Sequence, residues 1–177
     1  MKNIELASID QIDLIMKIIK ACTKHMIDNG IFQWNDKYPT KQSFIDDINN
    51  NDLFVLKLEN KIIGCVCASF DMDEFYKQIV WETSSKKNIY LHRLAIHPDY
   101  QGQGFAKYIM DYIENYAKEN GCLSVRLDTF SLNKKNNYLY SKLGYKKLGK
   151  IYFRDQSDMP FNCCLLYTSP SPRDWDE

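Results

Sequence analysis

A strand that runs through a glycine-containing turn directly into a helix is the feature that most constrains the fold of this 177-residue chain. Residues 89–96 have the apolar, β-branched character of a buried strand, and His97-Pro98-Asp99 ends it. From Phe105 onward, apolar residues recur with helical spacing until Asn120-Gly121, which is a typical helix end. Strand, turn and helix in this order indicate an α/β domain.

The turn itself, residues 97–104, has the chemistry of an anion site. Gly102 and Gly104 allow the backbone to approach a bulky anion, and the following helix N-terminus adds about 0.3–1 kcal/mol of attraction for a negative group. Pyrophosphate fits such a site. Two common pyrophosphate motifs are excluded, because Lys107 stands where G-x-G-x-x-G needs its third glycine and no G-K-[S/T] follows a P-loop spacing. The alternative is that the glycines serve only to start the helix.

The remaining hydrophobic pattern predicts alternating strands and helices, with at least one parallel strand pair. The expected strands are residues 4–7, 53–58, 62–70, 89–96, 123–128, 145–153 and 161–167. The expected helices are residues 8–28, 40–48, 105–120 and 134–143. Gly64 predicts a bulge or a close backbone approach, whereas residues 71–87 fit either a strand or a loop.

Length and composition limit the class of protein. The length predicts a single domain over residues 1–167, and the final TSPSPRDWDE, residues 168–177, has no structural period and is treated as a tail. Twenty-three basic and 23 acidic residues give a formal net charge of +0, which argues against a nucleic-acid partner.

The six cysteines do not form the regular pattern of a disulfide scaffold, so we expect reduced core residues. Cys163 and Cys164 should face opposite sides of a strand, and no metal site is expected. The N-terminus lacks the apolar stretch of a secretion signal, and no apolar run is long enough to span a bilayer. A cytoplasmic location without membrane contact is therefore expected.

Two motifs carry a resemblance to a known family. Gln101-x-x-Gly104-x-Ala106, after a strand and His-Pro-Asp, resembles the acetyl-coenzyme A pyrophosphate signature of GCN5-related N-acetyltransferases (GNAT), Q/R-x-x-G-x-G/A. The resemblance covers roughly residues 1–167 and is strongest over residues 91–145. It implies an α/β (α+β) GNAT fold, in which a mixed, splayed sheet of about seven strands is flanked by about four helices.

The second motif lies further along the chain, in the family's order and at a compatible distance. Asn133-x-x-Asn136-x-x-x-Tyr140-x-x-x-Gly144-Tyr145 resembles the family segment N-x-x-A-x-x-x-Y-x-x-x-G-F/Y. Asn136 departs from the usual alanine and Tyr145 from the commoner phenylalanine. These departures affect packing beside the cofactor but remove no reacting group.

The resemblance implies acetyl-CoA as co-substrate and assigns residues to it. Backbone N–H groups at the helix start would bind the pyrophosphate, the backbone that ends the preceding strand would bind the pantetheine arm like an added strand, and Lys134 or Lys135 would meet a phosphate. The implied cofactor-binding residues are Leu94, Ile96, Gln101, Gly102, Gln103, Gly104, Phe105, Ala106, Asn133 and Lys135.

Transfer of an acetyl group to an amine needs a proton acceptor and a proton donor. A lysine-like ammonium has a pKa of about 10.4, and the departing thiol one of about 8.5. Tyr140 is the candidate donor; the alternative is a core tyrosine, with Tyr138 two residues away. For the base, His92 shares strand parity with Leu94 and Ile96 and is expected to face the cleft if their backbones hold the cofactor. Glu82 or a water chain is the rival, and a buried backbone-bonded histidine is the alternative.

The backbone N–H of Leu94 is the expected oxyanion donor. The aromatic loop at residues 30–39 supplies Trp34 and Tyr38 as candidate acceptor-binding residues, unless they merely cover the core. The predicted function is direct acetyl transfer from acetyl-CoA to a primary amine of a small molecule, a peptide N-terminus or a lysine, without an acyl-enzyme. A noncatalytic acyl-CoA sensor and a protein-interaction module are the alternatives. The oligomeric state is not readable from the sequence, although the resemblance allows a homodimer, which is frequent among similar proteins.

Overall fold

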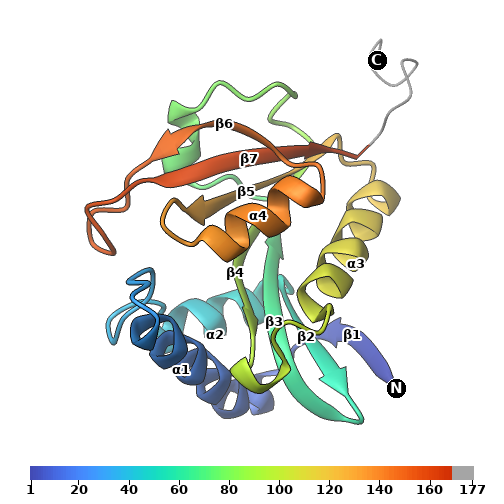
Figure 1. Ribbon diagram of the computed structural model, residues 1–177. Helices are drawn as coiled ribbons and strands as arrows, with labels where there is room; N and C mark the ends of the chain where they lie inside the picture. The colour runs from blue at the N-terminus through green and yellow to red at the C-terminus, as the bar shows by residue number, and fades with distance from the viewer. Residues whose placement is uncertain (169–177) are drawn as a thin grey trace.

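Seven strands form one mixed sheet with helices on both of its faces (Figure 1). The structure is a computed structural model and describes residues 1–168. The strands occur in the sheet order β1-β2-β3-β4-β5-β7-β6. They are β1 (Lys2–Leu6), β2 (Leu53–Leu58), β3 (Lys61–Ser69), β4 (Asn88–Ile96), β5 (Ser124–Phe130), β6 (Lys146–Ile151) and β7 (Phe161–Tyr167). The helices are α1 (Ile12–Asp28), α2 (Lys41–Asn49), α3 (Phe105–Glu119) and α4 (Lys134–Lys142). Short 3-10 turns are η1 (Ile9–Gln11), η2 (Glu74–Gln78) and η3 (Pro98–Tyr100).

The central pair, β4 and β5, is parallel over only a short length. Pairing runs from Asn88↔Ser124 to Leu91↔Leu127, although β4 continues to Ile96 and β5 to Phe130. Every other pair is antiparallel. The two halves of the sheet therefore separate beyond Leu91, as the expected splayed sheet requires (Figure 1).

Two apolar layers hold the helices against the sheet. On one face, α3 inserts Ile109, Met110 and Ile113 against strands β2 to β5, and Tyr140 of α4 joins this layer. On the other face, α1 and α2 pack against alternate positions of β2, β3 and β4, such as Val55. Successive side chains of a strand therefore enter different cores, as expected for a sheet that is covered on both faces.

All six cysteines are buried and free. Cys163 belongs to the cluster around η2, and Cys164 to the α3 layer. The expectations of reduced core cysteines and of opposite faces for this pair are confirmed.

A β-bulge in β4 corrects one expectation about the strand. Cys65 of β3 pairs with Ala95 and Cys67 pairs with His92, so one residue of β3 lies opposite two of β4. Arg93 has a φ of 53°, in the left-handed region. The extra residue shifts the alternation, so the expected shared face of His92 and Leu94 is wrong: the His92 ring contacts the buried Tyr76, whereas Leu94 packs with the α3 layer.

Element boundaries differ from expectation mainly at the edges of the fold. β1 begins two residues earlier and β6 ends two residues earlier than predicted. The ambiguous residues 71–87 form a loop that contains η2. Thr168, which we assigned to the tail, is buried and its N–H donates to the Leu123 carbonyl, while the rest of the predicted tail lies outside the described residues. No helix in residues 1–168 has the length and apolarity that crossing a membrane requires.

The close approach of the paired strands β3 and β4 at Gly64 gives a stability prediction. A Cβ on Gly64 would lie 2.7 Å from the Ala95 carbonyl oxygen, which is backbone and cannot move independently. A Cβ on Gly149 would meet only the flexible Cδ1 of Ile79, at 2.9 Å. We expect Gly64→Ala to lower the free energy of unfolding by about 1–3 kcal/mol and Gly149→Ala to cost less. Urea denaturation measures this, and equal losses would contradict the close approach.

Candidate active site

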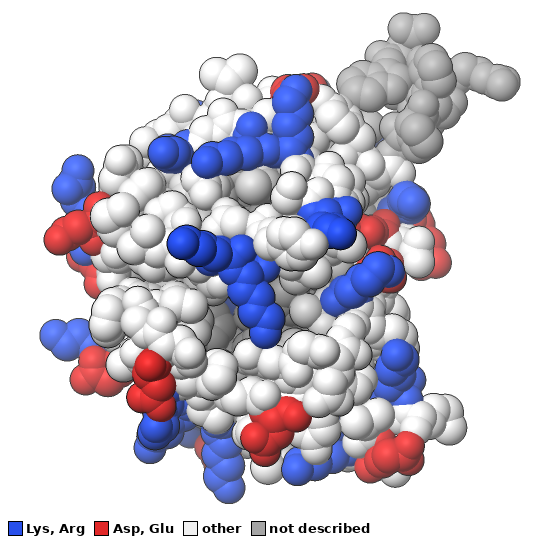
Figure 2. All heavy atoms as spheres, viewed as in Figure 1, with Lys and Arg blue, Asp and Glu red and all other residues white. Residues whose placement is uncertain are grey.

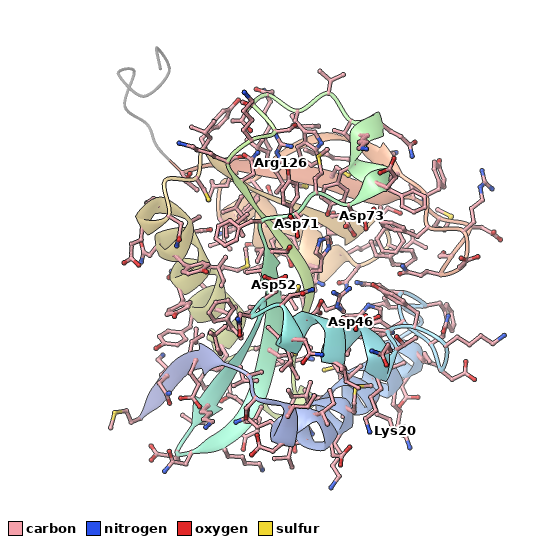
Figure 3. The ribbon with its side chains drawn as sticks, turned by 180° about the vertical axis from the view of Figure 1, so that it is seen from behind. Lys20, Asp46, Asp52, Asp71, Asp73 and Arg126 are labelled. Carbon is pink, nitrogen blue, oxygen red and sulfur yellow. The ribbon has the colours of Figure 1, made fainter. Side chains whose placement is uncertain are left out.

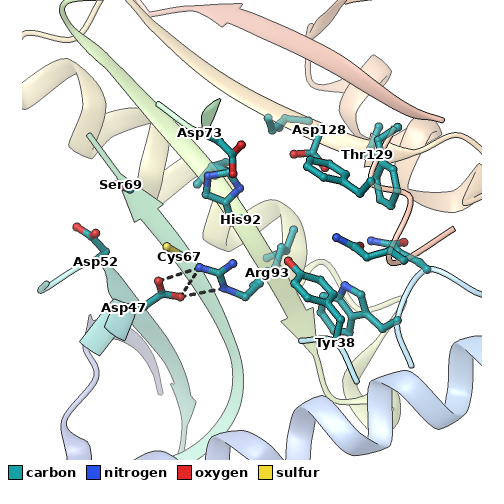
Figure 4. A pocket seen from close by; sticks show the side chains of 18 of the residues that line it. Tyr38, Asp47, Asp52, Cys67, Ser69, Asp73, His92, Arg93, Asp128 and Thr129 are labelled. Atoms are coloured by element: carbon teal, nitrogen blue, oxygen red, sulfur yellow. Dashed lines mark hydrogen bonds and ion pairs between the residues drawn. The ribbon is translucent and has the colours of Figure 1, made fainter. Parts of the chain in front are cut away.

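A cavity of about 370 Å³ opens where β4 and β5 separate (Figure 4). Its walls come from the loop after α1, from α2, from the ends of β3, β4 and β5, and from α4. Predicted site residues on its wall are Trp34, Tyr38, His92, Leu94 and Tyr140. The separation of the strands thus brings together residues that are far apart in the sequence.

The turn before α3 presents unpaired backbone N–H groups, as an anion site requires. Within the described chain, the N–H groups of residues 102–106 have no hydrogen-bond acceptor. Gly102 and Gly104 have φ values of 74° and 85°, and a Cβ added at either would meet no atom within 4 Å. The backbone is therefore open to a ligand on the side where glycine side chains are absent.

The end of β4 is an exposed strand edge toward the cavity. The His97 N–H donates to the Ile63 carbonyl of β3, so the alternation of strand groups directs the backbone groups of Ile96 and Leu94 away from β3. The Ile96 carbonyl already accepts from Gln101 Nε2 at 2.9 Å and from Cys22 Sγ at 3.1 Å. Gln101 therefore orients this strand end, and the Leu94 groups have no β5 partner.

The second motif lies at the start of α4. Asn133 is buried and caps the helix, because its Oδ1 accepts from the Asn136 N–H at 3.1 Å, and its Nδ2 donates to Gln33 at 3.1 Å. Lys134 and Lys135 are exposed. Lys and Arg side chains gather over α4 in Figure 2. Asn133 thus positions α4, and the lysines are available to a phosphate.

Tyr140 is buried yet has a hydroxyl that no protein group binds. Its side chain is 7% exposed and lines the cavity, and the described residues include no hydrogen-bond partner for the phenol. Burial raises the pKa of Tyr140 well above 10, with the Asp128 charge adding to the effect, so the phenol stays protonated at neutral pH. Tyr138, in contrast, is 64% exposed and lies under Lys142.

The two predicted base candidates lie in different places. His92 lines the cavity, and burial lowers its pKa to about 4, so the imidazole is neutral at physiological pH. Glu82 is not on the cavity wall: its carboxylate forms an ion pair with Lys146 and accepts from the Tyr167 hydroxyl. The structure therefore brings His92, but not Glu82, to Tyr140.

Asp128 is a cavity residue that sequence reasoning missed. It lies one residue past the last β5 residue paired with β4, on the wall opposite His92 (Figure 4). Burial raises its pKa to about 6, although the Tyr76 hydroxyl donates to it at 2.5 Å. A carboxylate with a pKa near neutral is suited to exchange protons with a bound ligand.

The bulge residue Arg93 is the second feature that the sequence did not indicate. Its Nε donates to Asp47 Oδ2 at 2.9 Å and its Nη2 to Oδ1 at 2.8 Å, a bidentate pair between β4 and α2 (Figure 4). Tyr38 also interacts with Arg93 through its hydroxyl. The pair ties the acceptor-side helix to the bulge that turns β4 away from β5.

The aromatic loop reaches the cavity as predicted. Tyr38 and Trp34 line it, but Trp34 is also 6% exposed and packs in the α1–α2 core. Trp34 therefore both covers the core and forms part of the cavity wall.

Comparison with known sequences identifies the family. A profile of the acetyltransferase (GNAT) family matches residues 15–145, about three quarters of the chain. The chain belongs to this family. Thialysine N-epsilon-acetyltransferase of Sus scrofa is 35% identical over 69 residues, which are 39% of this chain and 41% of that protein. The chain spans about two fifths of the length of the first curated relatives that it matches.

Solved structures agree with the GNAT fold. An acetyltransferase of the GNAT family from Streptococcus agalactiae superposes with a TM-score of 0.79 at 24% identity, covering 94% of this chain and 95% of that one. The PaiA N-acetyltransferase from Thermoplasma acidophilum, solved in complex with coenzyme A, has a TM-score of 0.69 at 17% identity, with coverage of 94% and 99%. The predicted family and fold class are confirmed.

The raised pKa of Asp128 in this GNAT domain gives a pH-dependent stability prediction. Because the folded pKa of about 6 exceeds the ordinary 3.8, the folded state binds the proton more tightly, and ionisation destabilises it as the pH rises through 6. Asp128→Asn removes that charge, while its Oδ1 can still accept from Tyr76. We expect it to raise the free energy of unfolding by about 1–3 kcal/mol at pH 8, with the difference vanishing below about pH 4.

Urea denaturation across this pH range measures the effect. Asp46→Asn, on the exposed surface of α2, is the matched control and should show no such trend. A pH-independent difference at residue 128 would contradict the assigned cause.

Proposed function

We propose that this chain is an acetyl-CoA-dependent N-acetyltransferase that transfers the acetyl group directly to a primary amine. The observation that carries the proposal is that two features occur together near the separated ends of β4 and β5. Unbound backbone N–H groups lie at the start of α3, and the unpartnered Tyr140 hydroxyl lies in the cavity. The first is suited to the diphosphate of coenzyme A and the second to its thiol.

The residues present fit acetyl-CoA without rearrangement of the turn. The N–H groups of residues 102–106 would bind the diphosphate, and Gly102 and Gly104 leave room for it. The Leu94 backbone would bond the pantetheine arm along the free strand edge, with Ile96 following it. Lys134 and Lys135, the first two residues of α4, would meet a phosphate. The PaiA N-acetyltransferase of the same fold is solved in complex with coenzyme A, which supports coenzyme A as the class of ligand.

In the reaction, the acceptor nitrogen attacks the thioester carbonyl and the coenzyme A thiol leaves. Tyr140 donates a hydrogen bond to the departing sulfur, and its raised pKa keeps the phenol protonated while it does so. The released thiolate, with a pKa of about 8.5, then takes a proton from solvent. The Leu94 N–H is placed to meet the developing oxyanion. Asp128 and His92 flank the entry of the amine, and Asp128, with its pKa of about 6, receives the proton of the amine.

The alternatives receive less support from the described residues. A noncatalytic sensor would have no use for an unbound phenol inside the cavity. A docking module would present its aromatic loop to solvent, whereas Trp34 is buried and Phe32 is the exposed ring of that loop. Direct transfer to an amine remains the function that accounts for the most groups.

Acetyl-CoA binding tests the turn. Gly104→Glu places a negative side chain beside the proposed diphosphate, and we expect it to abolish binding in a calorimetric titration. Gly121→Glu is the matched control, because Gly121 lies past the opposite end of α3 with a similar φ of 70° and equally open space. Loss of affinity in both variants, or in neither, would remove the site from this turn.

Steady-state kinetics test the phenol. Tyr140→Phe should lower kcat by about 10²-fold or more and leave acetyl-CoA affinity nearly unchanged, because only a hydrogen bond made late in the reaction is lost. Tyr138→Phe on the exposed face of α4 is the control and should behave as the parent chain. A fast Tyr140→Phe variant would mean that another group stabilises the departing thiolate.

A further inference from the structure

The loop of residues 71–87 is fastened to one face of β5 at two points. Arg126 and Asp128 are two residues apart on this strand, so their side chains lie on the same face. The Arg126 guanidinium lies 4.5 Å from the centre of the Trp81 ring, and the Tyr76 hydroxyl donates to Asp128. The rear view of Figure 3 shows Arg126 and Asp73 in the same part of the molecule. The loop therefore reaches the carboxyl group to which we assign the proton of the amine.

Tyr76 is the buried residue of η2 in this loop. Its side chain is 0% exposed and does not line the cavity. Its hydroxyl donates to Asp128 Oδ2 at 2.5 Å, and the centres of the Tyr76 and His92 rings are 5.9 Å apart. Tyr76 therefore lies behind the cavity wall, in contact with both groups that flank the entry of the amine.

Contacts within the loop fix Tyr76 before any ligand binds. The Asp73 side chain caps η2, because it accepts from the Phe75 N–H at 2.9 Å. The Trp81 indole N–H donates to the Tyr76 carbonyl at 2.9 Å, and the two rings lie 5.3 Å apart. Trp81 is in turn covered by the Arg126 guanidinium. The position of the phenol thus depends on the loop and on β5, and not on a group inside the cavity.

The two oxygens of Asp128 have different surroundings. Oδ2 accepts from Tyr76, whereas no group of residues 1–168 donates to Oδ1. Asp128 itself lines the cavity. A carboxyl group held through one oxygen by a buried phenol has a fixed orientation, and its other oxygen is left for a ligand.

We propose that Tyr76 is a positioning residue for acetyl transfer: its hydroxyl holds Asp128 Oδ2, so that Oδ1 takes the proton from the acceptor amine. This inference rests on the proposed function, in which Asp128 receives that proton, and adds the residue that orients Asp128. The proton passes from the amine nitrogen to Oδ1, and Tyr76 keeps its own. Burial, and next the charge of Asp128, raise the pKa of the Tyr76 hydroxyl well above its ordinary value.

Asp128 is the group whose charge changes near pH 6 in these surroundings. Burial raises its pKa to about 6, the Tyr76 hydrogen bond opposes this, the Asp73 charge adds to it and the Arg93 charge opposes it. The other titratable groups that face Asp128 are uncharged at pH 6 and above. They are His92, whose pKa burial lowers to about 4, and Tyr38, Tyr140 and Cys163, whose pKa values burial raises. Loss of the Tyr76 hydrogen bond should therefore raise the pKa of Asp128 further.

Tyr76→Phe tests the contact, because it keeps the ring and removes the hydroxyl. We expect the pKa of Asp128 to rise by about one pH unit or more, since a hydrogen bond to the charged form is lost. Carbon-13 NMR of protein with labelled aspartate carboxyl groups measures this pKa, and Asp128→Asn assigns the signal. Tyr90→Phe is the matched control: Tyr90 is 1% exposed in the same apolar cluster, and its hydroxyl bonds Arg126. It should leave the pKa of Asp128 unchanged.

Kinetics of acetylation test the consequence for the reaction. The probe is n-butylamine, glycinamide or Nα-acetyl-lysine amide, whichever the parent protein acetylates fastest. The titration of the amine itself cancels in the ratio of parent to variant kcat/KM. For Tyr76→Phe, this ratio should be about fivefold larger at pH 6 than at pH 8, because less of the variant Asp128 is ionised at pH 6. In an Asp128→Asn background, Tyr76→Phe should have the same effect at both pH values.

The outcomes separate this inference from the proposed function. An unchanged Asp128 titration in Tyr76→Phe, or an equal shift in Tyr90→Phe, would overturn the inference. A loss of kcat/KM that is independent of pH would reduce Tyr76 to a packing role and would overturn it as well. Absence of acetylation of all three amines by the parent protein would contradict the proposed function, and the NMR titration would then decide by itself whether Tyr76 holds Asp128.

Discussion

The separation of β4 from β5 is the constraint on which the rest of the molecule depends. Their parallel pairing stops at Leu91 and Leu127, and the bulge at Arg93 then turns β4 away. A left-handed residue in a strand is costly, so other contacts must hold it. The bidentate pair of Arg93 with Asp47 does this from α2. Without the separation there would be no cavity, no free strand edge and no space in front of Tyr140.

The separated sheet also divides the charges of a chain whose formal net charge is +0. Exposed lysines and unbound amides lie on the α3 and α4 side, whereas carboxylates line the cavity from its other walls. The described cavity wall contains five aspartates and no lysine, so a balanced sequence still gives the cavity a locally acidic wall. The net charge argued against a polyanion partner but held no information about this local division.

Local patterns predicted the elements well and the site only in part. β7 and the turn before α3 follow from hydrophobic alternation and glycine placement, which depend on neighbouring residues. The shared face of His92 and Leu94 was wrong because the bulge between them arises from pairing with β3, where Cys67 is paired with His92, 25 residues further along the chain. His92 still lines the cavity. Asp128 and Asp47 carry no local signature, since a single aspartate at a strand or helix end is common. Glu82, the rival base, lies off the cavity wall because its partners Lys146 and Tyr167 are far along the chain and carry no local signal.

Two arginines lie at opposite ends of the region where β4 and β5 separate, and their partners differ in charge. At the closed end, the fully buried Arg126 of β5 donates to the Tyr90 hydroxyl and the Thr83 carbonyl and stacks on Trp81 at 4.5 Å, with no carboxylate partner in the described chain. At the open end, Arg93 has a carboxylate partner at the cavity wall. The partners of Arg126 are carbonyl and hydroxyl groups, which carry dipoles but no net charge. The closed end therefore has no excess negative charge. Among the described residues, the aspartates that line the cavity without a Lys or Arg ion pair, such as Asp52 and Asp128, lie at the open end and form no ion pair with the buried Arg126.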